Sequence, residues 1–238
     1  MAQPHDVDHL NSTFRHHGAH AVLQEALSGR LGRIAMVSSF GADSVVLLHM
    51  VAIINRRAPV LFLDTGKLFA ETLAYQMELA ERLNLQNIRI LSADAAELSR
   101  EDPQGALHAS DPNRCCALRK SRPLARGLAG FDGWITGRKR FQSAERSCLA
   151  HFERAAGQLK INPLAYWAPQ DLNEYMEQNR LPRHPLVARG YPSLGCAPCT
   201  QPVRAGDDPR AGRWRGSNKT ECGIHLPQTR DAKTGEFT

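Results

Sequence analysis

RIAMVSSFGADSVVLLHMVAII, residues 33–54, joins two apolar runs through a loop of small residues. The first run, residues 33–37, predicts a buried strand, and residues 45–54, which are apolar nearly all round, predict a buried helix. The loop between them, SSFGADS at 38–44, lets backbone N–H groups approach an anion, and the start of a helix favours negative charge. The stretch therefore predicts either an anion-binding loop or an ordinary strand-to-helix turn.

Strands and helices continue to alternate along the chain. Further strands are predicted at 60–63, 87–91, 133–136 and 159–161, and further helices at 10–30, 69–83, 114–128 and 169–179. Within the helix at 69–83, the spacing places Leu73, Met77, Ala80 and Leu83 on one apolar side. Strands that alternate with helices imply parallel neighbours joined by right-handed crossovers. We predict an α/β fold with an open, mostly parallel twisted sheet flanked by helices.

The last quarter of the chain has a different composition. After residue 181, prolines and glycines break any long element, which is typical of loops arranged around a site. From about residue 206 the chain predicts an arm whose order depends on packing against the body. We therefore expect one binding domain over residues 1–205, which carries a metal centre, and a mobile C-terminal tail over residues 206–238.

Composition narrows the class of protein. The 238 residues can bury a core without disulfides, contain no apolar run long enough to cross a bilayer, and begin without the apolar stretch of a signal peptide. We expect a cytoplasmic protein that does not bind membranes. The net charge of +6 suits a small polyanion as well as nucleic acid, but no segment interleaves aromatic and basic residues as a stacking platform would. We therefore expect no nucleic-acid partner.

Three predicted strands end in residues suited to binding an anion. The loop at 38–44 follows the first strand, Asp64-Thr65-Gly66 follows the second, and Gly137-Arg138-Lys139-Arg140 follows a later one. The carboxyl ends of parallel strands meet at one edge of the sheet, where open α/β folds bind ligands. We expect these segments to supply donors and positive charge to a single crevice.

Four of the six cysteines form two pairs, Cys115-Cys116 and Cys196-x-x-Cys199. In a reducing compartment, such pairs indicate a four-thiolate metal site, for which zinc and a [4Fe–4S] cluster are the candidates. Adjacent cysteines suit the separate irons of a cluster better than one tetrahedral ion, and buried inert thiols are the remaining alternative. Arg119 and Lys120, one turn beyond Cys116, would offset the charge of such a centre or form ordinary salt bridges.

The other two cysteines differ in their surroundings. Cys222 lies in KTECGIH, residues 219–225, where Lys219 and His225 favour a reactive thiolate by lowering its pKa. Glu221 opposes this effect unless it faces away or helps to dock a partner. Cys148 belongs to no motif, and we expect it to be a partly buried structural thiol.

Six motifs carry a resemblance to a known family. They are SxGADS at 39–44, DTGxLF at 64–69, RCCxxRK at 114–120, GCxxCT at 195–200, RAGRW at 210–214 and KTECGIH at 219–225. Together they resemble the assimilatory adenylyl-sulfate reductases of the type that carries an iron–sulfur cluster. The loop at 38–44 also resembles that of the pyrophosphate-loop ATPases, with Ser-Phe where that loop has Gly-Gly. The resemblance implies the adenine nucleotide alpha-hydrolase-like fold.

The resemblance implies a reaction in sulfate assimilation for cysteine biosynthesis. The substrate would be adenosine 5′-phosphosulfate, and Cys222 would attack its sulfur to give S-sulfocysteine and AMP. Thioredoxin or a glutaredoxin-like dithiol would then release sulfite. One [4Fe–4S] cluster per subunit would be bound by Cys115, Cys116, Cys196 and Cys199 and would not donate electrons. A homo-oligomer is compatible with the family pattern.

The resemblance also implies roles for other residues. Lys120 and His225 would serve catalysis beside Cys222. The substrate would be bound by Ser38, Ser39, Gly41, Ser44, Leu63, Arg138, Arg210 and Arg213. One position departs from the family pattern, because Phe141 stands where an acidic residue is usual, which puts the roles of Arg138 and Arg140 in doubt.

Three alternatives stay open at this stage. A reductase of the 3′-phosphorylated nucleotide would share the loop and the tail motif, but such relatives generally lack the paired cysteines. An ATP-dependent enzyme that thiolates tRNA would use the same loop. A zinc-containing nucleic-acid module would explain the cysteines alone.

Overall fold

The structure is a computed structural model and describes residues 6–215, 219, 221 and 223–225, the last of these by its backbone alone. A six-stranded sheet has the order β3-β2-β1-β4-β6-β5, and only β5 pairs antiparallel with its neighbour. This confirms the predicted open, mostly parallel sheet. The strands are β1 (Ile34–Ser38), β2 (Val60–Leu63), β3 (Ile88–Leu91), β4 (Gly133–Ile135), β5 (Phe152–Ala155) and β6 (Gln158–Ile161).

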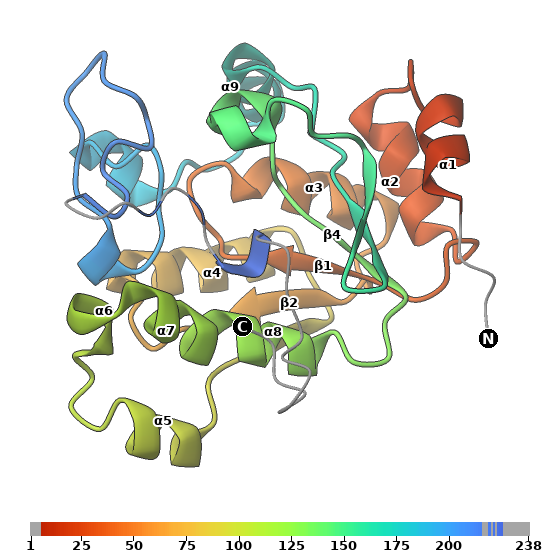
Figure 1. Cartoon of the computed structure of the whole chain (residues 1–238). Helices are drawn as coiled ribbons and strands as arrows, with labels where there is room; N and C mark the ends of the chain where they lie inside the picture. The colour runs from red at the N-terminus through yellow and green to blue at the C-terminus, as the bar shows by residue number, and fades with distance from the viewer. Residues whose placement is uncertain (1–5, 216–218, 220, 222, 226–238) are drawn as a thin grey trace.

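Helices cover both faces of the sheet (Figure 1). On one face, α2, α3, α4 and α9 share a large apolar cluster with alternate residues of the strands, including Met36 and Phe62. On the other face, Leu124 and Leu128 pack against Leu61 and Leu63. The helices are α1 (Val7–Thr13), α2 (Ala19–Leu27), α3 (Ser44–Ile54), α4 (Ala70–Arg82), α5 (Ala95–Glu101), α6 (Leu107–Ser110), α7 (Pro112–Cys116), α8 (Arg122–Gly127) and α9 (Pro169–Gln178).

Short helical turns connect these elements: η1 (Ala117–Ser121), η2 (Arg140–Gln142), η3 (Ala144–Arg146), η4 (Pro185–Arg189), η5 (Ala197–Cys199) and η6 (Gly223–His225). Of these, η1 is a π-helical turn between α7 and α8. The single helix predicted at 114–128 is therefore interrupted. Pro123 at the start of α8 lacks the N–H that would continue an α-helical ladder, and a π turn absorbs the mismatch.

Two further sequence expectations were wrong. The helix predicted at 10–30 is two helices, because Gly18 lies between them and begins α2 as its N-cap. In α4 the buried face is formed by Thr72, Tyr75 and Leu79, whereas Met77 is 65% exposed. The Tyr75 hydroxyl donates to the Pro182 carbonyl at 2.8 Å. A buried polar side chain with such a partner escapes a pattern that counts only apolar residues.

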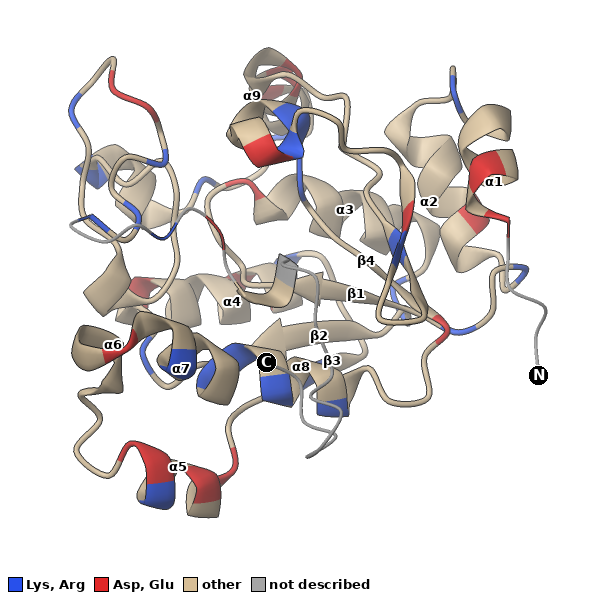
Figure 2. Cartoon of the chain, in the orientation of Figure 1, with Lys and Arg blue, Asp and Glu red and all other residues tan. Residues whose placement is uncertain are grey.

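Two ion pairs join the acidic residues of α5 to the basic residues of α8, which Figure 2 colours red and blue. Arg122 pairs with Glu101 at 2.7 Å, and Arg126 pairs with Glu97 at 3.2 Å. These pairs join α5 to the helix that follows the first cysteine pair. Among the described helices, none is long and apolar enough to span a bilayer.

Candidate active site

A cavity of about 260 Å³ opens at the carboxyl ends of the parallel strands. Ser38 ends β1, Leu63 ends β2, and residues 136–139 follow β4, and all of these line the cavity. This is the edge at which open α/β sheets bind ligands. The predicted site residues that line it are Ser38, Ser39, Gly41, Ser44, Leu63, Lys120, Arg138, Arg210 and Arg213. The structure thus brings them to one place, while their roles remain predictions.

The loop at 38–44 borders the cavity at the start of α3. The Phe40 N–H donates to Ser38 Oγ at 3.1 Å, and Phe40 has a φ of 49°, in the left-handed region that favours glycine. The Phe40 ring is fully buried and meets Phe62 edge-on, with centroids 5.2 Å apart. Burial of the ring offsets the backbone cost, so phenylalanine is held in a conformation that favours glycine.

The start of α3 borders the cavity and has no side-chain cap. Its N-cap residue, Asp43, makes no side-chain capping hydrogen bond, because its carboxylate pairs with the Lys139 ammonium at 2.9 Å. Gly41, Asp43 and Ser44 all line the cavity. A helix start without a side-chain cap can donate its N–H groups to a phosphate.

Arg138 is a buried cation on the cavity wall. It forms an ion pair with Glu153 on β5 and donates to Asn162 Oδ1 at 3.0 Å. Burial lowers the pKa of the Arg138 guanidinium below its ordinary value, and Glu153 opposes this shift. Arg140 does not line the cavity, since it donates to the Leu149 carbonyl at 2.7 Å and stacks over Tyr166. The position of Arg140 therefore does not support the role that the family resemblance implies for it.

Glu221, which precedes Cys222, lies between two arginines. Glu221 Oε2 accepts from Arg146 Nε at 2.7 Å and lies 2.6 Å from Arg146 Nη2, while Oε1 lies 3.6 Å from Arg210 Nη2. Glu221 is 7% exposed and Arg146 is 6% exposed, and all three side chains line the cavity. The acid that would raise the pKa of a neighbouring thiol is thus paired with opposite charge.

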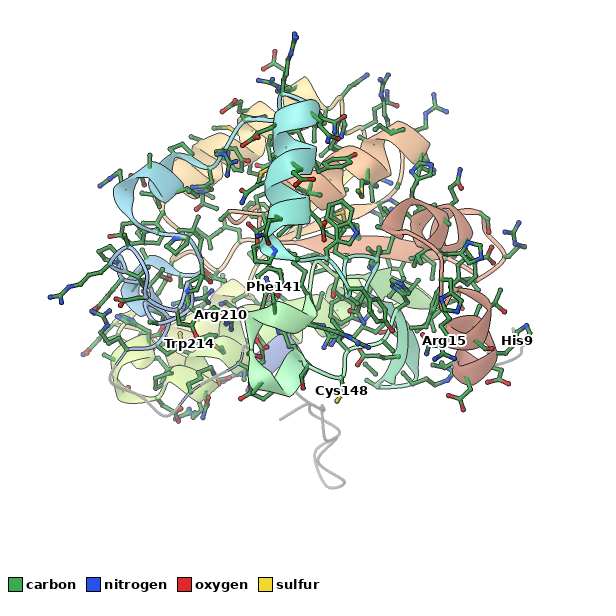
Figure 3. All side chains as sticks on the ribbon, turned by 90° about the horizontal axis from the view of Figure 1, so that it is seen from above. His9, Arg15, Phe141, Cys148, Arg210 and Trp214 are labelled. Carbon is green, nitrogen blue, oxygen red and sulfur yellow. The ribbon has the colours of Figure 1, made fainter. Side chains whose placement is uncertain are left out.

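Arg213 and Trp214 belong to a segment that packs on the second cysteine pair. The Gln201 N–H donates to the Gly212 carbonyl at 2.8 Å, and the Trp214 N–H donates to the Cys199 carbonyl at 3.0 Å. Arg213 Nη1 donates to the Leu194 carbonyl at 2.8 Å, and its guanidinium lies 4.5 Å from the centroid of the Trp214 ring. In Figure 3, Arg210 and Trp214 lie close together on the opposite side of the view from His9 and Arg15.

The π turn η1 sends its two basic residues to different places. Arg119 is buried, pairs with Asp102 at 2.7 Å and donates to the Thr65 carbonyl at 3.0 Å. Lys120 lines the cavity. Both cations still act on the paired cysteines, since Arg119 opposes the raised pKa of Cys115 and Lys120 opposes that of Cys199. Arg119 therefore forms the ordinary salt bridge that the sequence analysis kept as an alternative, whereas Lys120 faces the cavity.

The four paired cysteines lie in one neighbourhood. Cys115, Cys116 and Cys196 are buried, and Cys199 is half-buried. Burial raises the pKa of the Cys115 thiol, Arg119 opposes this shift, and negative charge on Cys196 and Cys199 raises the pKa further. Burial likewise raises the pKa of Cys199, which Cys196 reinforces and Lys120 opposes. Lys120 therefore acts electrostatically on Cys199 and also lines the cavity.

The donor set fits a thiolate-bound metal centre. The cysteines come from α7 and from the loop at η5, and the Thr65 hydroxyl lies 3.2 Å from Cys196 Sγ. As arranged among the described residues, no group of three or more His, Cys, Asp or Glu side chains could hold a single metal ion. Four soft sulfur donors, three of them buried, suit either the separate irons of a cluster or a zinc ion. In both cases the cysteine side chains would have to move to meet the metal.

The remaining predicted features are Cys222, His225 and Cys148. Cys222 and the side chain of His225 lie outside the described residues. Cys148 is exposed, so the expectation of a partly buried thiol was wrong; its sulfur lies at the outer edge of the molecule, after the turn at η3 (Figure 3).

The sequence patterns missed two buried cations near the cavity. Arg146 follows the basic run at 137–140 by six residues, with no motif to indicate it. Lys160, 4% exposed on β6, lies 4.8 Å from the centroid of Trp134, which lines the cavity. Burial lowers the pKa of Lys160 to about 7, with a further lowering by Arg138. A lone lysine inside the apolar strand predicted at 159–161 was the signal that could have revealed it.

The comparisons with known proteins agree with this geometry. The family model described as phosphoadenosine phosphosulfate reductase domain matches residues 33–202, more than half of the chain. An adenosine 5′-phosphosulfate reductase of Mesorhizobium japonicum is 48% identical and covers 95% of each chain. One of Chelativorans sp. is 49% identical over 92% of this chain and 90% of its own. A phosphoadenosine 5′-phosphosulfate reductase of Gloeobacter violaceus is 37% identical over 92% and 93%.

Solved structures show the same architecture. A phosphoadenylyl-sulfate reductase from Candida auris, crystallised as a phosphate complex, superposes with a TM-score of 0.71 at 25% identity, over 85% of this chain and 98% of its own. Yeast FAD synthetase, at 14% identity and a TM-score of 0.55 over 85% and 70%, shares the fold alone. Since the family model spans most of the sheet and the cavity, and two reductases match nearly end to end, the chain belongs to the phosphoadenosine phosphosulfate reductase family.

Proposed function

We propose that this protein is an adenosine 5′-phosphosulfate reductase, which releases sulfite and AMP in sulfate assimilation for cysteine biosynthesis. The relatives that bear this name support the proposal over most of the chain. The observation that carries it is one residue that links two features predicted separately from the sequence. Lys120 lines the cavity and also opposes the raised pKa of Cys199, which supports a nucleotide site beside the paired cysteines.

The first chemical step forms a bond between two sulfur atoms. The Cys222 thiolate attacks the sulfate sulfur of the substrate, the bond from that sulfur to the bridging oxygen breaks, and AMP leaves with the electron pair. The protein has to neutralise a mixed anhydride of two acids and to aim the thiolate. His225 and Lys219, which flank Cys222 in the sequence, would favour the thiolate.

The second step reduces the S-sulfocysteine. One thiol of thioredoxin or of a glutaredoxin-like protein attacks Cys222 Sγ, and sulfite leaves with the electron pair of the sulfur–sulfur bond. The second thiol of the partner then releases Cys222, and the partner keeps the disulfide. The dithiol supplies both electrons. Because the thiolate and the partner must stay reduced, we assign the reaction to the cytoplasm.

Substrate binding is assigned to the residues gathered at the cavity. The open start of α3, with Ser38, Ser39, Gly41 and Ser44, would hold the phosphate group. Arg138, Arg210, Arg213 and Lys120 would neutralise the phosphosulfate, and Leu63 would border the nucleoside. A fixed donor aimed at the departing phosphate is worth roughly 3 kcal/mol of barrier lowering.

A [4Fe–4S] cluster, one per subunit, would be held by the four paired cysteines. The donor chemistry fits, since thiolates of Cys115, Cys116, Cys196 and Cys199 would meet Arg119 and Lys120 as countercharges. When bound, the cluster supplies a compact charged centre that ties α7 to the loop at η5. It takes no part in the electron balance above.

A second candidate is reduction of the 3′-phosphorylated nucleotide. It is favoured by the relative from Gloeobacter violaceus and the structure from Candida auris, whose names refer to that substrate. The value of kcat/KM for each nucleotide, measured with the same dithiol, decides between them. We expect the unphosphorylated nucleotide to be used better, in keeping with the more similar relatives.

The proposed function is tested by replacing the nucleophile. We expect Cys222→Ser to abolish sulfite release from adenosine 5′-phosphosulfate while leaving iron and acid-labile sulfide at wild-type levels. Cys148→Ser, at the exposed cysteine, is the matched control and should retain activity. Sulfite release by the Cys222 variant would contradict the assignment of the nucleophile. Release of pyrophosphate from ATP by the wild-type protein would contradict the reductase proposal itself.

A further inference from the structure

We propose that Asp102 is a positioning residue for the paired cysteines. It fixes the Arg119 guanidinium against the turn at residues 64–66, which follows β2. That turn carries the Thr65 hydroxyl, which lies against Cys196. The inference rests on the part of the proposed function that assigns a metal centre to the four paired cysteines. Asp102 acts in it through its partners and not as a ligand.

The carboxylate of Asp102 is buried, and both of its oxygens accept hydrogen bonds. The side chain is 2% exposed. Its Oδ2 accepts from Arg119 Nη2 at 2.7 Å and from Arg119 Nε at 3.3 Å, and its Oδ1 accepts from the Leu107 N–H at 2.9 Å. Leu107 begins α6, and Asp102 directly follows α5. The carboxylate therefore holds the guanidinium at a fixed place relative to two helices, through charge-assisted bonds that are stronger than neutral ones.

The guanidinium reaches the turn at 64–66 with its remaining terminal nitrogen. Arg119 Nη1 donates to the Thr65 carbonyl at 3.0 Å. A Cβ on Gly66 would lie 3.4 Å from the same nitrogen, and Gly66 has a φ of 66°, in the left-handed region that favours glycine. The backbone of the turn thus lies directly on the guanidinium. We expect a displaced Arg119 to release the Thr65 carbonyl and to loosen the turn.

The Thr65 hydroxyl connects this turn to the second cysteine pair. Thr65 is 3% exposed, and its Oγ1 lies 3.2 Å from Cys196 Sγ. The same oxygen accepts from the Lys67 N–H at 3.2 Å, which leaves the hydroxyl proton available for the sulfur. The Lys67 carbonyl in turn accepts from the Ala197 N–H at 2.8 Å. The turn is therefore joined to the loop at η5 by a side-chain contact and by a backbone hydrogen bond.

These contacts reach both cysteine pairs. Arg119 lies three residues after Cys116, in the turn η1 that directly continues α7. Through the turn at 64–66, the same guanidinium is connected to Cys196. Groups beyond the ligands of a metal centre orient those ligands, and removal of such a group typically weakens metal binding about 10- to 100-fold. Asp102, which fixes the residue between the two pairs, is placed to have this effect.

The simpler role of a buried ion pair is stability alone. Removing one partner leaves an uncompensated charge in the interior, and this destabilises the fold in either case. A fall in Tm for an Asp102 variant is therefore expected under both roles. The roles differ at the sulfur atoms, because only positioning changes the bonds that the cysteines form with a metal.

The first measurement is the rate at which the anaerobically purified protein loses its metal to excess EDTA. Asp102→Asn keeps an acceptor for the Leu107 N–H and removes the charge that holds Arg119. We expect it to lose metal about 10- to 100-fold faster than wild type. Glu101→Gln is the matched control, since it breaks the neighbouring carboxylate–arginine pair, with Arg122 at 2.7 Å, and should lose metal at the wild-type rate. The comparison holds for zinc as well as for iron.

The second measurement reports on the cysteine sulfur itself. Hydrogen bonds to the sulfurs tune the electronic properties of an iron–sulfur centre, and the iron–cysteine stretching bands in resonance Raman spectra respond to them. We expect Asp102→Asn and Thr65→Val to shift the same bands in the same direction, since both weaken or remove the hydroxyl contact with Cys196. Thr65→Ser, which keeps the hydroxyl, should retain the wild-type bands.

A second variant keeps the test decisive if Asp102→Asn does not fold. Asp102→Asn/Arg119→Gln removes both charges and leaves no unpaired ion of this pair in the interior. Because the turn at 64–66 then lacks the guanidinium, we expect this double variant to lose metal at least about tenfold faster than wild type. Its bands should shift as those of Thr65→Val do.

A wild-type rate of metal loss in the Asp102 variants would overturn the inference. Faster loss with unshifted bands in the iron-loaded protein would do so too, since it would indicate a role in stability alone. The outcome is separable from that of the proposed function. Wild-type protein that holds neither iron nor zinc would contradict the proposed metal centre and the inference with it. If wild-type protein holds metal and releases sulfite, and Asp102→Asn holds metal as firmly, only the role of Asp102 fails.

Discussion

Gly195 adjoins the second cysteine pair and has no room for a side chain. A Cβ there would lie 2.6 Å from Arg213 Cζ, and Arg213 is held by the Leu194 carbonyl. Because Arg213 is flexible at its far end, we expect Gly195→Ala to displace the guanidinium and leave the backbone in place. The Kd for AMP should rise about tenfold, as expected for the loss of one charge-assisted hydrogen bond, and Tm should fall by less than about 4 °C.

Calorimetry and thermal unfolding check this prediction together. Gly18→Ala is the control, since nothing lies within 4 Å of a Cβ there and the φ of Gly18 is −73°. A large fall in Tm for Gly195→Ala, with AMP affinity unchanged, would show that Arg213 does not yield and does not bind the phosphate.

Single residues were predictable where they belonged to a motif. Ser38, Lys120 and Arg213 were named from the sequence, and all three line the cavity. Arg146 could not be found in this way, because its importance depends on Glu221, 75 residues away in sequence. Only the folded chain brings these two charges together.

At the scale of elements, the segment at 210–214 depends on one close approach. A Cβ on Gly212 would lie 3.1 Å from the carbonyl carbon of Gln201, and the same strand-like contact continues between Trp214 and Cys199. Here the obstacle is backbone, which cannot rotate away. We expect Gly212→Ala to cost about 2 kcal/mol of unfolding free energy, in the range of overpacked cores.

Urea unfolding of the purified protein measures this cost, and amide hydrogen exchange at Gln201 and Trp214 locates it. Exchange should quicken at these two amides more than in β1. Unchanged exchange there would show that the segment accommodates the methyl group without moving.

Elements were predictable where one residue type dominates a run. β2 was predicted at its observed bounds, because Val60–Leu63 is apolar and buried throughout. β5 was missed, since Phe152–Ala155 is an edge strand whose Glu153 and Arg154 leave no apolar pattern. The π turn η1 was missed for a different reason: its residues suit a helix, and the change of hydrogen-bond register becomes visible only in three dimensions.

For the whole molecule, Lys160 couples stability to pH. Its pKa is about 7 in the folded protein, whereas an unfolded chain holds lysine near about 10.4. Between these values the unfolded state binds more protons, so Lys160 makes the free energy of unfolding rise as pH increases from about 7 toward 10. We expect Lys160→Met to remove this contribution.

Urea unfolding at several pH values between about 6.5 and 9.5 measures the difference between wild type and Lys160→Met. Taking the difference cancels the contributions of groups that titrate alike in both proteins. The wild-type curve should rise relative to the variant as pH increases. Parallel curves would show that Lys160 stays protonated in the fold, through its contact with Trp134 and the nearby Glu153.

The fold as a whole was predictable because each crossover follows a general rule. Alternating strands and helices imply parallel pairing, and the carboxyl ends of the strands then define the binding edge. The strand order and the antiparallel β5 required the structure. The location of the cavity followed from topology, while the buried charges of Arg146 and Lys160 did not.

The bulky residue in the anion loop has a consequence for how a ligand binds. The Phe40 ring packs against Phe62, and the Phe40 backbone has a left-handed conformation that phenylalanine seldom adopts. The packed ring therefore restricts the loop to few other conformations. A loop with two glycines at this place would be freer in the empty protein and would lose more conformational entropy when it closes around a phosphate. Here that entropy is lost during folding, so under the proposed function the phosphate would meet a loop that already has its bound shape.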